Sequence, residues 1–331
     1  MVELGIDLGT ANTVVCDTGQ GVVFDEPSVL LMRRNGARRG RVVTLGQHAS
    51  ELVGRTPAGM TAIRPLQDGV ITDLETARAY LRAVVRRIAQ HPWQRSRSRV
   101  VIGVPGGATD LEQRALLEAA DEAGISRATA LDEPIAGAVG CGIDPLERRV
   151  HMVIDVGGGT AEVTAFCYGG VLTSRSCRVA GDEMTLAVYR HLREEHELIV
   201  AEQTAEEIKI RAGVETGPSL VVQGRDAGSG RPRVLTLPVA EITDVIRPLT
   251  DTIIQTLAAC LDDLPAQATA DVLADGILLF GGAALTRGFS ENLEQAFGFP
   301  ITLAANPLTC VAEGAAQCLR SPDLLAAYGR S

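Results

Sequence analysis

The chain has 331 residues, of which 46% are apolar and 22% charged, and its formal net charge is −10. This length exceeds one typical domain and predicts roughly two domains of about 150 residues each. Sequence-independent nucleic-acid binding needs clustered Lys and Arg, so an acidic chain is expected to have no nucleic-acid partner. Aromatic residues make up only 3%, so the core is expected to consist of Val, Leu, Ile and Ala.

The cysteines and histidines show no pattern typical of a metal site. None of the seven cysteines forms a C-x-x-C pair, and the five histidines are scattered without an evident ligand spacing. We therefore expect reduced cysteines in a cytoplasmic protein and no zinc site. No apolar run reaches the roughly 18 residues of a membrane span, and from the first residues we expect no signal peptide and no amphipathic anchor helix.

The expected elements alternate between strands and helices, which predicts an α/β fold. In chain order they are a strand–turn–strand unit at 5–15, helix 78–88, strand 100–104, helix 110–123, a second strand–turn–strand unit at 153–163, helices 185–195 and 205–211, strands 220–223 and 233–237 around a loop at 224–232, helix 242–259 perturbed at Pro248, and strand 277–280.

The two strand–turn–strand units resemble each other. Each has an apolar strand that ends in Asp, a tight turn of Gly and Thr, and a second strand that alternates with period two. Asp7 and Asp155 are 148 positions apart (155 − 7), about one domain length. We interpret the pair as a duplication, with two copies of one fold facing each other.

Both units continue into a strand, whereas a Rossmann fingerprint or a P-loop requires a helix to open at the glycines. A dinucleotide-binding fold is therefore disfavoured. A single turn of this kind is more often an ordinary hairpin, so the hypothesis depends on the pair.

The two turns are candidate phosphate-binding elements, because backbone N–H groups in a tight glycine turn can point at one anion. The residues concerned are Gly9, Thr10, Ala11 and Asn12 in the first turn, and Gly157, Gly158, Gly159 and Thr160 in the second. Asp7 and Asp155 precede the turns and suit a hydrated Mg²⁺, although either could simply cap its turn.

Three further segments are candidate site elements. Glu133 begins a small-residue helix, where it either caps the helix or orients and deprotonates an attacking water; Glu133 and Thr160 are the catalytic candidates. Lys209, the only lysine of the chain, lies one turn after Glu206. This pair could hold a ribose hydroxyl or be an exposed ion pair. Gly281, Gly282 and Ala283 follow a strand and could admit a flat base or form an ordinary turn.

In this order the segments resemble the actin/Hsp70/sugar-kinase superfamily, and the nearest resemblance is to the MreB family of bacterial actin-like cell-shape proteins. It is carried by DLGTANT (7–13), DEPSV (25–29), GRTP (54–57), AIRPLQDGVI (62–71), AGDEM (180–184), TAEEIK (204–209), GRD (224–226) and NPLTCVA (306–312).

The resemblance implies an actin-like fold of two duplicated ribonuclease-H-like domains around a nucleotide cleft. Domain I would span 1–148, with a small insert at about 31–74, and would be completed by a C-terminal helix over 307–331. Domain II would span 149–306, with an insert at about 183–247. The resemblance also implies ATP and Mg²⁺ as cofactors, self-association into protofilaments, and cell-wall or morphogenesis partners.

The family also lies at the inner face of the plasma membrane, which it reaches through an N-terminal helix or an apolar loop. The loop position here is 91–99, so Trp93 and Arg95 are the membrane candidates. A Trp beside basic residues suits an anionic bilayer, and the alternative is a Trp packed on its own domain.

Two positions depart from the family pattern, because Ala161 replaces a second Thr and Ala283 replaces a third Gly. We therefore expect ATP binding and a slow ATPase, with a nucleotide-locked scaffold as one alternative. The other is an Hsp70-like or sugar-kinase-like phosphotransferase, although the segment between Val29 and Ile71 offers no obvious sugar-binding carboxylate cluster.

Overall fold

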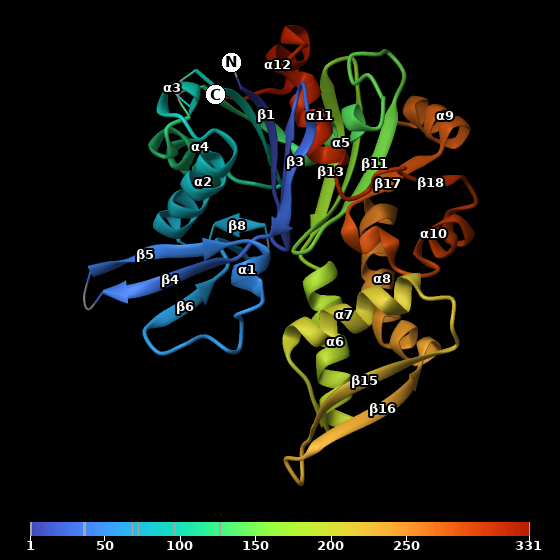
Figure 1. Ribbon diagram of the computed structural model, residues 1–331. Coiled ribbons are helices and arrows are strands. Elements are labelled where there is room, and N and C mark those ends of the chain that lie inside the picture. The colour runs from blue at the N-terminus through green and yellow to red at the C-terminus, as the bar shows by residue number, and fades with distance from the viewer. Residues whose placement is uncertain are drawn as a thin grey trace.

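The computed structural model describes residues 2–35, 38–67, 69–71, 73–95, 97–125 and 127–330. Two five-stranded sheets form its two halves, which we call the first and second lobes (Figure 1). The first sheet has the order β10-β9-β1-β2-β3. Its strands are β1 (Glu3–Leu8), β2 (Asn12–Asp17), β3 (Gly21–Pro27), β9 (Arg99–Val104) and β10 (Ala128–Asp132).

The second sheet repeats this topology in the order β13-β12-β11-β17-β18. Its strands are β11 (His151–Val156), β12 (Ala161–Cys167), β13 (Gly170–Cys177), β17 (Ile277–Phe280) and β18 (Ile301–Leu303). In both sheets three antiparallel strands are followed by two parallel ones.

The strand register supports the duplication that the sequence predicts. Asp7 of β1 pairs with Val14 of β2, and Asp155 of β11 pairs with Glu162 of β12. Asp155 lies 148 positions after Asp7, and Glu162 lies 148 positions after Val14. The two Asp residues therefore occupy equivalent places, each at the end of a central strand and just before the turn.

Two helices pack between the sheets. They are α5 (Glu133–Gly140) and α11 (Cys310–Cys318). A single buried cluster contains Ile135 of α5, Val101 of the first sheet, Val153 and Phe280 of the second, and Val311 of α11. The helices thus join the lobes through a shared apolar core.

The crossing of α5 and α11 depends on glycine. A Cβ on Gly314 would lie 1.8 Å from the carbonyl oxygen of Ala136, and one on Gly140 would lie 2.0 Å from that of Cys310. No side chain can stand at such distances, so these two glycines set how closely the helix backbones approach.

Each lobe carries a smaller part below its sheet in Figure 1. In the first lobe it contains β4 (Leu30–Asn35), β5 (Arg38–Leu45), α1 (Gln47–Ser50), β6 (Met60–Ile63), β7 (Leu66–Gln67) and β8 (Val70–Ile71). In the second lobe it contains α6 (Gly181–Glu194), β14 (Leu198–Ile199), α7 (Glu202–Val214), β15 (Ser219–Asp226), β16 (Pro232–Pro238) and α8 (Val239–Asp262).

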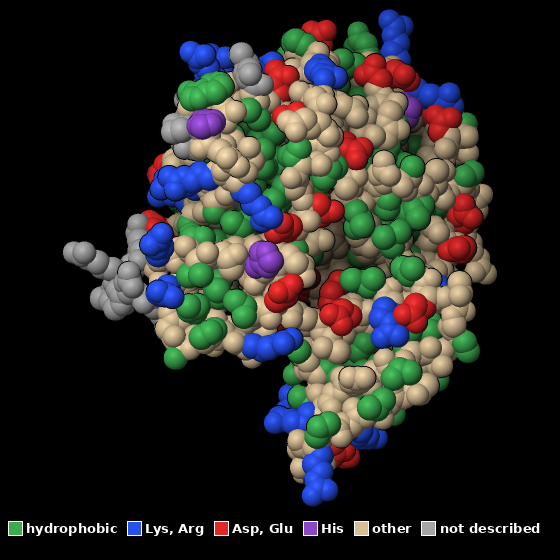
Figure 2. Space-filling model, viewed as in Figure 1, with side chains coloured by type: hydrophobic (Ala, Val, Ile, Leu, Met, Phe, Trp, Pro, Cys, Tyr) green, Lys and Arg blue, Asp and Glu red, His purple; other side chains and the backbone are tan. Residues whose placement is uncertain are grey.

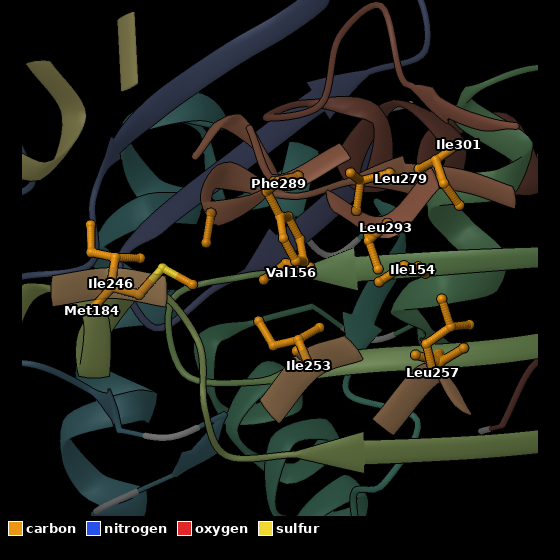
Figure 3. Packing of buried hydrophobic residues seen from close by; sticks show 14 of the residues in the cluster. Ile154, Val156, Met184, Ile246, Ile253, Leu257, Leu279, Phe289, Leu293 and Ile301 are labelled. Atoms are coloured by element: carbon orange, nitrogen blue, oxygen red, sulfur yellow. The ribbon is translucent and has the colours of Figure 1, made fainter. Parts of the chain in front are cut away.

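The remaining helices are α2 (Leu74–Ile88), α3 (Pro92–Arg95), α4 (Asp110–Ala123), α9 (Ala266–Asp275), the short 3₁₀ helix η1 (Gly282–Leu285), α10 (Phe289–Phe297) and α12 (Pro322–Tyr328). Helices α2 and α4 pack on the outer face of the first sheet, and α9 and α10 pack on the second sheet. Helix α12 belongs instead to the core shared by the lobes, and η1 directly follows β17. The core of the second lobe is aliphatic, as the composition predicts. Figure 3 shows Ile154 and Val156 of β11 between Leu279 and Phe289 on one side and Ile253 of α8 on the other.

The predicted elements are all present, and several of them begin or end at other residues than predicted. Helix 110–123 and strand 277–280 have the predicted bounds, whereas α6, α7 and α8 begin three or four residues earlier than expected. The loop predicted at 224–232 is too long, since β15 continues to Asp226. Helix α8 runs through Pro248, whose carbonyl oxygen accepts a hydrogen bond from Thr252 Oγ1 at 3.1 Å.

The C-terminal segment departs from the single helix expected over 307–331. It forms α11 and then α12, because α11 ends at Cys318 and Pro322 starts a new helix after a turn. Among the described residues, no helix combines the length and the apolar character that crossing a membrane requires.

Candidate functional site

A cavity of about 290 Å³ lies between the lobes and is lined by residues of both. Figure 2 shows a hollow between the two halves with acidic side chains beside it. Every predicted nucleotide, metal or catalytic residue lines the cavity: Asp7, Gly9, Thr10, Ala11, Asn12, Glu133, Asp155, Gly157, Gly158, Gly159, Thr160, Glu206, Lys209, Gly281, Gly282 and Ala283. The fold therefore brings together segments that lie up to 276 positions apart (283 − 7).

The turn at 9–12, which joins β1 to β2, is held by a relay of hydroxyl groups. Tyr80 of α2 donates to Thr13 Oγ1 at 3.0 Å, Thr13 and Ser28 are bonded at 2.8 Å, and Ser28 donates to the carbonyl oxygen of Gly9 at 2.6 Å. Thr13, Ser28 and Tyr80 are buried. Because Ser28 is itself held by Thr13 and Tyr80, its hydrogen bond to the Gly9 carbonyl fixes the orientation of that peptide unit in the turn.

The turn at 157–160, which joins β11 to β12, lies against the first turn. A Cβ on Gly158 would stand 3.0 Å from Ala11 Cβ and 3.2 Å from the Ala11 nitrogen. The turn is also tied to the start of α6, since Gly181 and Asp182 donate their N–H groups to the carbonyl oxygens of Gly157 and Gly158. The lobes thus present two glycine turns to one another at van der Waals distance.

Three carboxyl groups face the cavity and disfavour one another's charge. Burial raises the pKa of Asp7 to about 7, and the charge of Asp25 adds to the increase. Burial, followed by the charges of Asp7 and Asp155, raises the pKa of Glu133 well above its usual value. Burial, followed by Asp7 and Glu162, does the same for Asp155. Asp7 and Glu133 keep some accessible surface only because they line the cavity.

The donor set fits a hard divalent cation. Mg²⁺ prefers carboxylate oxygens and keeps several water molecules, and its charge would offset the repulsion that raises these pKa values. Asp7 and Asp155 occupy equivalent ends of the two central strands, so they are the two residues that would hold the cation, directly or through water.

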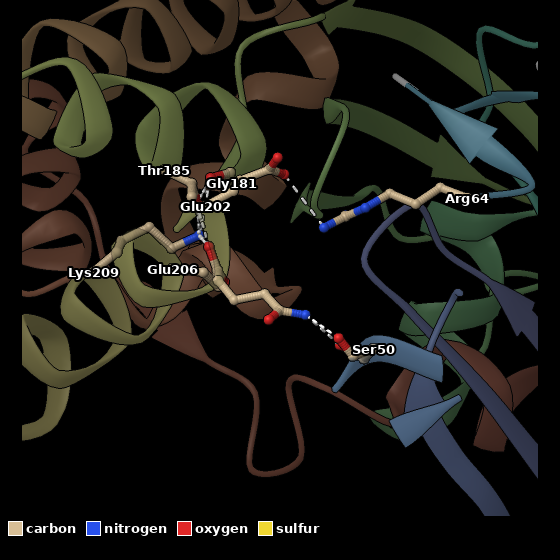
Figure 4. A network of polar contacts seen from close by, with 8 residues as sticks. Ser50, Arg64, Gly181, Thr185, Glu202, Glu206 and Lys209 are labelled. Atoms are coloured by element: carbon tan, nitrogen blue, oxygen red, sulfur yellow. Dashed lines mark hydrogen bonds and ion pairs between the residues drawn. The ribbon is translucent and has the colours of Figure 1, made fainter. Parts of the chain in front are cut away.

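Lys209 belongs to a compact polar network with α6 (Figure 4). Its Nζ lies 2.7 Å from a carboxylate oxygen of Glu206, and it donates to the Gly181 carbonyl at 2.9 Å and to Thr185 Oγ1 at 3.1 Å. Thr185 also donates to Glu206. The side chain of Lys209 is only 11% exposed, so the alternative of an exposed ion pair is wrong for the lysine.

The turn after β17 approaches β11 closely. Gly281 has a positive φ of 91°, and a Cβ there would lie 2.4 Å from the carbonyl oxygen of Val156. The next residues form η1, so the ordinary strand-to-helix turn also describes this segment. Near this turn the cavity has an apolar wall of exposed side chains, namely Ile210, Val214, Leu285 and Leu308.

Hydrogen bonds cross from one lobe to the other beside the cavity. The carboxylate of Glu162 in β12 accepts the backbone N–H groups of Gly106 at 2.8 Å and Gly107 at 3.3 Å. Glu162 is buried, and burial raises its pKa although these two N–H groups oppose the shift. On the same first-lobe side, Thr10 Oγ1 accepts the N–H of Gly69 at 3.0 Å.

Two further bonds link the smaller parts of the lobes. Arg64 lies 3.4 Å from Glu202, and Gln203 donates to Ser50 Oγ at 3.1 Å (Figure 4). Both contacts join the smaller part of one lobe to that of the other. Polar contacts therefore hold the lobes together in two places, beside the cavity and between the smaller parts.

The sequence interpretation missed several residues on the cavity. Asp25 and Asp182 line it, as do the four apolar side chains of its wall. Asp25 and Asp182 stand inside the segments that carry the family resemblance, which was the available signal. The apolar residues come from α7, η1 and the loop before α11, and no local pattern in the sequence connects them.

The two membrane candidates belong to one short helix. Trp93 and Arg95 belong to α3, and Trp93 does not line the cavity. The Trp93 side chain is 59% exposed and stacks on His91 with ring centroids 6.2 Å apart; the side chain of Arg95 is outside the described residues.

The two departures from the family pattern have different surroundings. Ala161 is fully buried and does not line the cavity, whereas Ala283 does.

Comparisons with known proteins agree with this geometry. Residues 1–327 match the family model described as MreB/Mbl protein. The chain is 37% identical over 328 residues to the cell shape-determining protein MreB of Escherichia coli (strain K12), covering 97% of this chain and 94% of the relative.

Two solved structures share the fold. MreB 5 of Spiroplasma citri bound to AMPPNP has a TM-score of 0.88 at 30% identity, covering 97% of this chain and 96% of the other. MamK in a double helical filament has a TM-score of 0.79 at 24% identity, covering 97% and 99%, and at this identity the likeness concerns the fold alone. The actin-like fold predicted from the sequence is confirmed.

Proposed function

This chain belongs to the MreB/Mbl family, and from that premise we propose that it is an ATP-binding bacterial actin homologue that polymerises with ATP. The observation that carries the proposal is the cavity in which two glycine turns of opposite lobes meet beside Asp7, Asp155 and Glu133. An arrangement of this kind binds a polyphosphate chain and its cation between two bodies that can close on it.

ATP would lie across the cavity, from the two glycine turns to the apolar wall. Its phosphates would lie between the turns at 9–12 and 157–160 and would accept hydrogen bonds from backbone N–H groups there. The ribose would lie near the Glu206–Lys209 pair, and the base would lie on the apolar wall beside Gly281, Gly282 and Ala283. The solved MreB 5 of Spiroplasma citri, which shares this fold and is bound to AMPPNP, supports nucleotide binding by this chain.

Hydrolysis requires a group that can orient and deprotonate water. Glu133 lies at the start of α5 and faces the cavity beside Asp7 and Asp155. When Mg²⁺ is bound, its charge stabilises the phosphates and favours the ionised carboxylates. Ionised Glu133 would then accept a proton from the attacking water, and Thr160 would position the terminal phosphate from the opposite turn.

We further propose that the filament lies along an anionic membrane in the cytoplasm and organises cell-wall or morphogenesis partners. Membership of the cell-shape family supports the partners. The exposed Trp93 on α3, two positions before Arg95, supports the membrane contact, because an interfacial Trp near basic residues suits an anionic bilayer.

A scaffold that binds ATP without turnover is the second candidate. It is favoured by Ala283, whose methyl group lines the cavity where the family pattern has a glycine. The buried position of Ala161, away from the cavity surface, gives it no support.

The test is pelleting of the purified chain with ATP, ADP or no nucleotide, with and without anionic liposomes, while phosphate release is followed in the same sample. We expect ATP-dependent pelleting with slow phosphate release. Glu133→Ala should abolish phosphate release and retain ATP binding, because the carboxylate acts on water. Glu207→Ala is the matched control, since Glu207 is exposed on α7 and outside the cavity.

The other outcomes separate the alternatives. ATP-dependent pelleting without phosphate release from the unmodified chain would favour the scaffold. A chain that never pellets, and whose turnover increases with a sugar or a peptide, would overturn the filament proposal in favour of a phosphotransferase or chaperone.

A further inference from the structure

Two of the five histidines lie close together in the second lobe, although their spacing in the sequence predicts no metal site. His191 lies in the last turn of α6, His196 follows two residues after that helix ends, and Glu241 lies in the first turn of α8. One ring nitrogen of each histidine and a carboxylate oxygen of Glu241 all lie within 4.8 Å of one another. None of the three residues lines the cavity between the lobes.

Both imidazole rings point at the same atom. His191 Nε2 lies 2.6 Å from Glu241 Oε1, and His196 Nε2 contacts that oxygen as well. The rings meet edge to face, with centroids 5.3 Å apart. A different arrangement occurs at His151, where one histidine faces one carboxylate, Glu147, at 3.6 Å.

The residue after the second histidine has an unusual backbone conformation. Glu197, which directly follows His196, has a φ of 49°, a value that costs free energy for a residue other than glycine. The conformation is held by Arg233, which donates to the His196 carbonyl at 2.8 Å, and by Ala227, whose N–H donates to the Glu197 carbonyl at 2.8 Å. The turn therefore places the His196 ring beside His191 at the cost of local strain.

We propose that His191, His196 and Glu241 form a binding site for a late first-row divalent cation of the Zn²⁺ class, with water in the fourth position. Two imidazole nitrogens and one carboxylate oxygen are a donor set that suits such cations, whereas Mg²⁺ prefers oxygen alone. The site is thus chemically distinct from the carboxylates between the lobes.

The geometry needs little adjustment to accept the cation. Tetrahedral coordination with bonds of about 2.0–2.1 Å places the ligand atoms roughly 3.3 Å apart. The Glu241 oxygen would move outward by less than about 1 Å from its present hydrogen bonds, a change that rotation of a carboxylate allows. The side chains are 19%, 24% and 28% exposed, in the order His191, His196 and Glu241, so a cation can enter from solvent.

A bound cation would fasten three segments together. It would join the end of α6, the turn at 195–197 and the start of α8. Helix α6 also carries Gly181 and Thr185, which contact Lys209 at the cavity. Occupancy would therefore stabilise the small part of the second lobe, and by mass action the stabilisation would grow with cation concentration.

The experiment is a Co²⁺ titration of the full chain in excess Mg²⁺, followed by visible absorption. Tetrahedral Co²⁺ with nitrogen donors gives a strong visible band, oxygen sites give a weak one, and the cysteines would add a thiolate band in the near ultraviolet. We expect one nitrogen-type site, with affinity falling at least about tenfold in His191→Ala, His196→Ala and Glu241→Gln. His151→Ala removes a lone His–Glu pair and should leave the affinity unchanged.

A second measurement uses the unmodified chain, so it holds even where a variant folds poorly. Zn²⁺ should protect His191 and His196 from acylation by diethyl pyrocarbonate, read by mass spectrometry, and leave the exposed His48 reactive. Equal reactivity of His191 and His196 with and without Zn²⁺ would overturn the proposal. So would a Co²⁺ signal that carries a thiolate band and persists in all three variants.

Discussion

At the scale of single residues, the site is governed by carboxyl groups that the fold forces together. Asp155 is buried and Asp7 and Glu133 are partly buried around one cavity; burial raises the pKa of each carboxyl group, and the charge of Asp7 raises the pKa of Glu133 and Asp155 further. Such a cluster is unfavourable without a cation. On the proposed function, binding of Mg²⁺ and a nucleotide would offset this unfavourable free energy and would couple ligand binding to stability.

The first prediction concerns the pH dependence of stability without nucleotide and with a chelator. The pKa of Asp7 rises from 3.8 to about 7 on folding, so the folded chain binds the proton more tightly than the unfolded chain. The stabilisation is complete below pH 3.8 and is lost as the pH rises toward 7. The melting temperature should therefore fall between pH 5 and about 7.

Asp7→Asn should flatten this fall, and Mg²⁺ with nucleotide should reduce it, because both remove the unfavourable charge. Asp251→Asn is the control, since Asp251 is exposed on α8. A melting temperature that rises over the same pH interval would contradict the assignment.

The residues of the site could be predicted where the sequence repeats itself and could not be where contacts are assembled from distant elements. Asp7 and Asp155 were found because their strand–turn–strand units look alike. Val214 was missed, because nothing in the local sequence shows which residues an apolar side chain on α7 will contact. Leu308 was also missed, although it stands inside the segment NPLTCVA (306–312) that carries part of the family resemblance. His191 and His196 were dismissed, since Glu241 joins them only after α8 folds back.

At the scale of elements, the crossing of α5 and α11 is a contact between helix backbones that only glycine allows. Gly314 lies against the Ala136 carbonyl and Gly140 lies against Cys310. The two helices also bury apolar residues of both sheets, so their separation sets how the lobes sit on each other.

The second prediction is that Gly314→Ala destabilises the chain by about 2 kcal/mol or more, because the added methyl group forces two buried helices apart. Chemical denaturation would measure the free energy of unfolding. The control is Gly217→Ala, where a Cβ would meet Ser219 O at an ordinary 3.8 Å. Equal stability of the two variants would show that the crossing adapts without cost.

Element types were predictable because hydrophobic periodicity and turn residues act locally. Helix 110–123 has its predicted bounds because Thr109 forms a capping box with Glu112 and Gly124 ends the helix in a left-handed conformation. The start of α6 was missed because Ala180 offers no side-chain cap, and the helix begins instead on bonds to the turn at 157–160.

At the scale of the whole molecule, closure depends on polar contacts across the gap. Glu162 accepts two backbone N–H groups from the first lobe in a buried place, whereas Arg64 and Glu202 meet in an exposed one. Exposed ion pairs contribute little, roughly 0–1 kcal/mol, while a buried charge-assisted bond contributes more. The Glu162 contact is therefore the stronger of the two.

The third prediction is that Glu162→Ala opens the lobes. The loss should increase the radius of gyration measured by small-angle X-ray scattering and speed nucleotide dissociation about tenfold, which corresponds to roughly 1.4 kcal/mol. Glu202→Ala, which removes the exposed contact, should change neither quantity appreciably. A chain that stays equally compact without Glu162 would show that the α5–α11 core alone sets closure.

The overall arrangement could be predicted from the duplication and the family resemblance, and the finer partition could not. Two like units 148 residues apart imply two like sheets, and the register confirms this. The division at residue 148 and the insert limits stay predictions. The C-terminal segment folds as two helices because Pro322 restarts it, a local effect that the family-based expectation of one helix overlooked.

The place of Lys209 gives the molecule a built-in chemical reporter. The chain contains a single lysine, and its amine lies at the cavity beside Glu206 and Thr185. A reagent that acylates primary amines therefore has one side-chain target, Lys209, besides the terminal α-amine. The extent of labelling reads directly whether that cavity is filled, and a protease specific for lysine would cut the chain at one position, within α7.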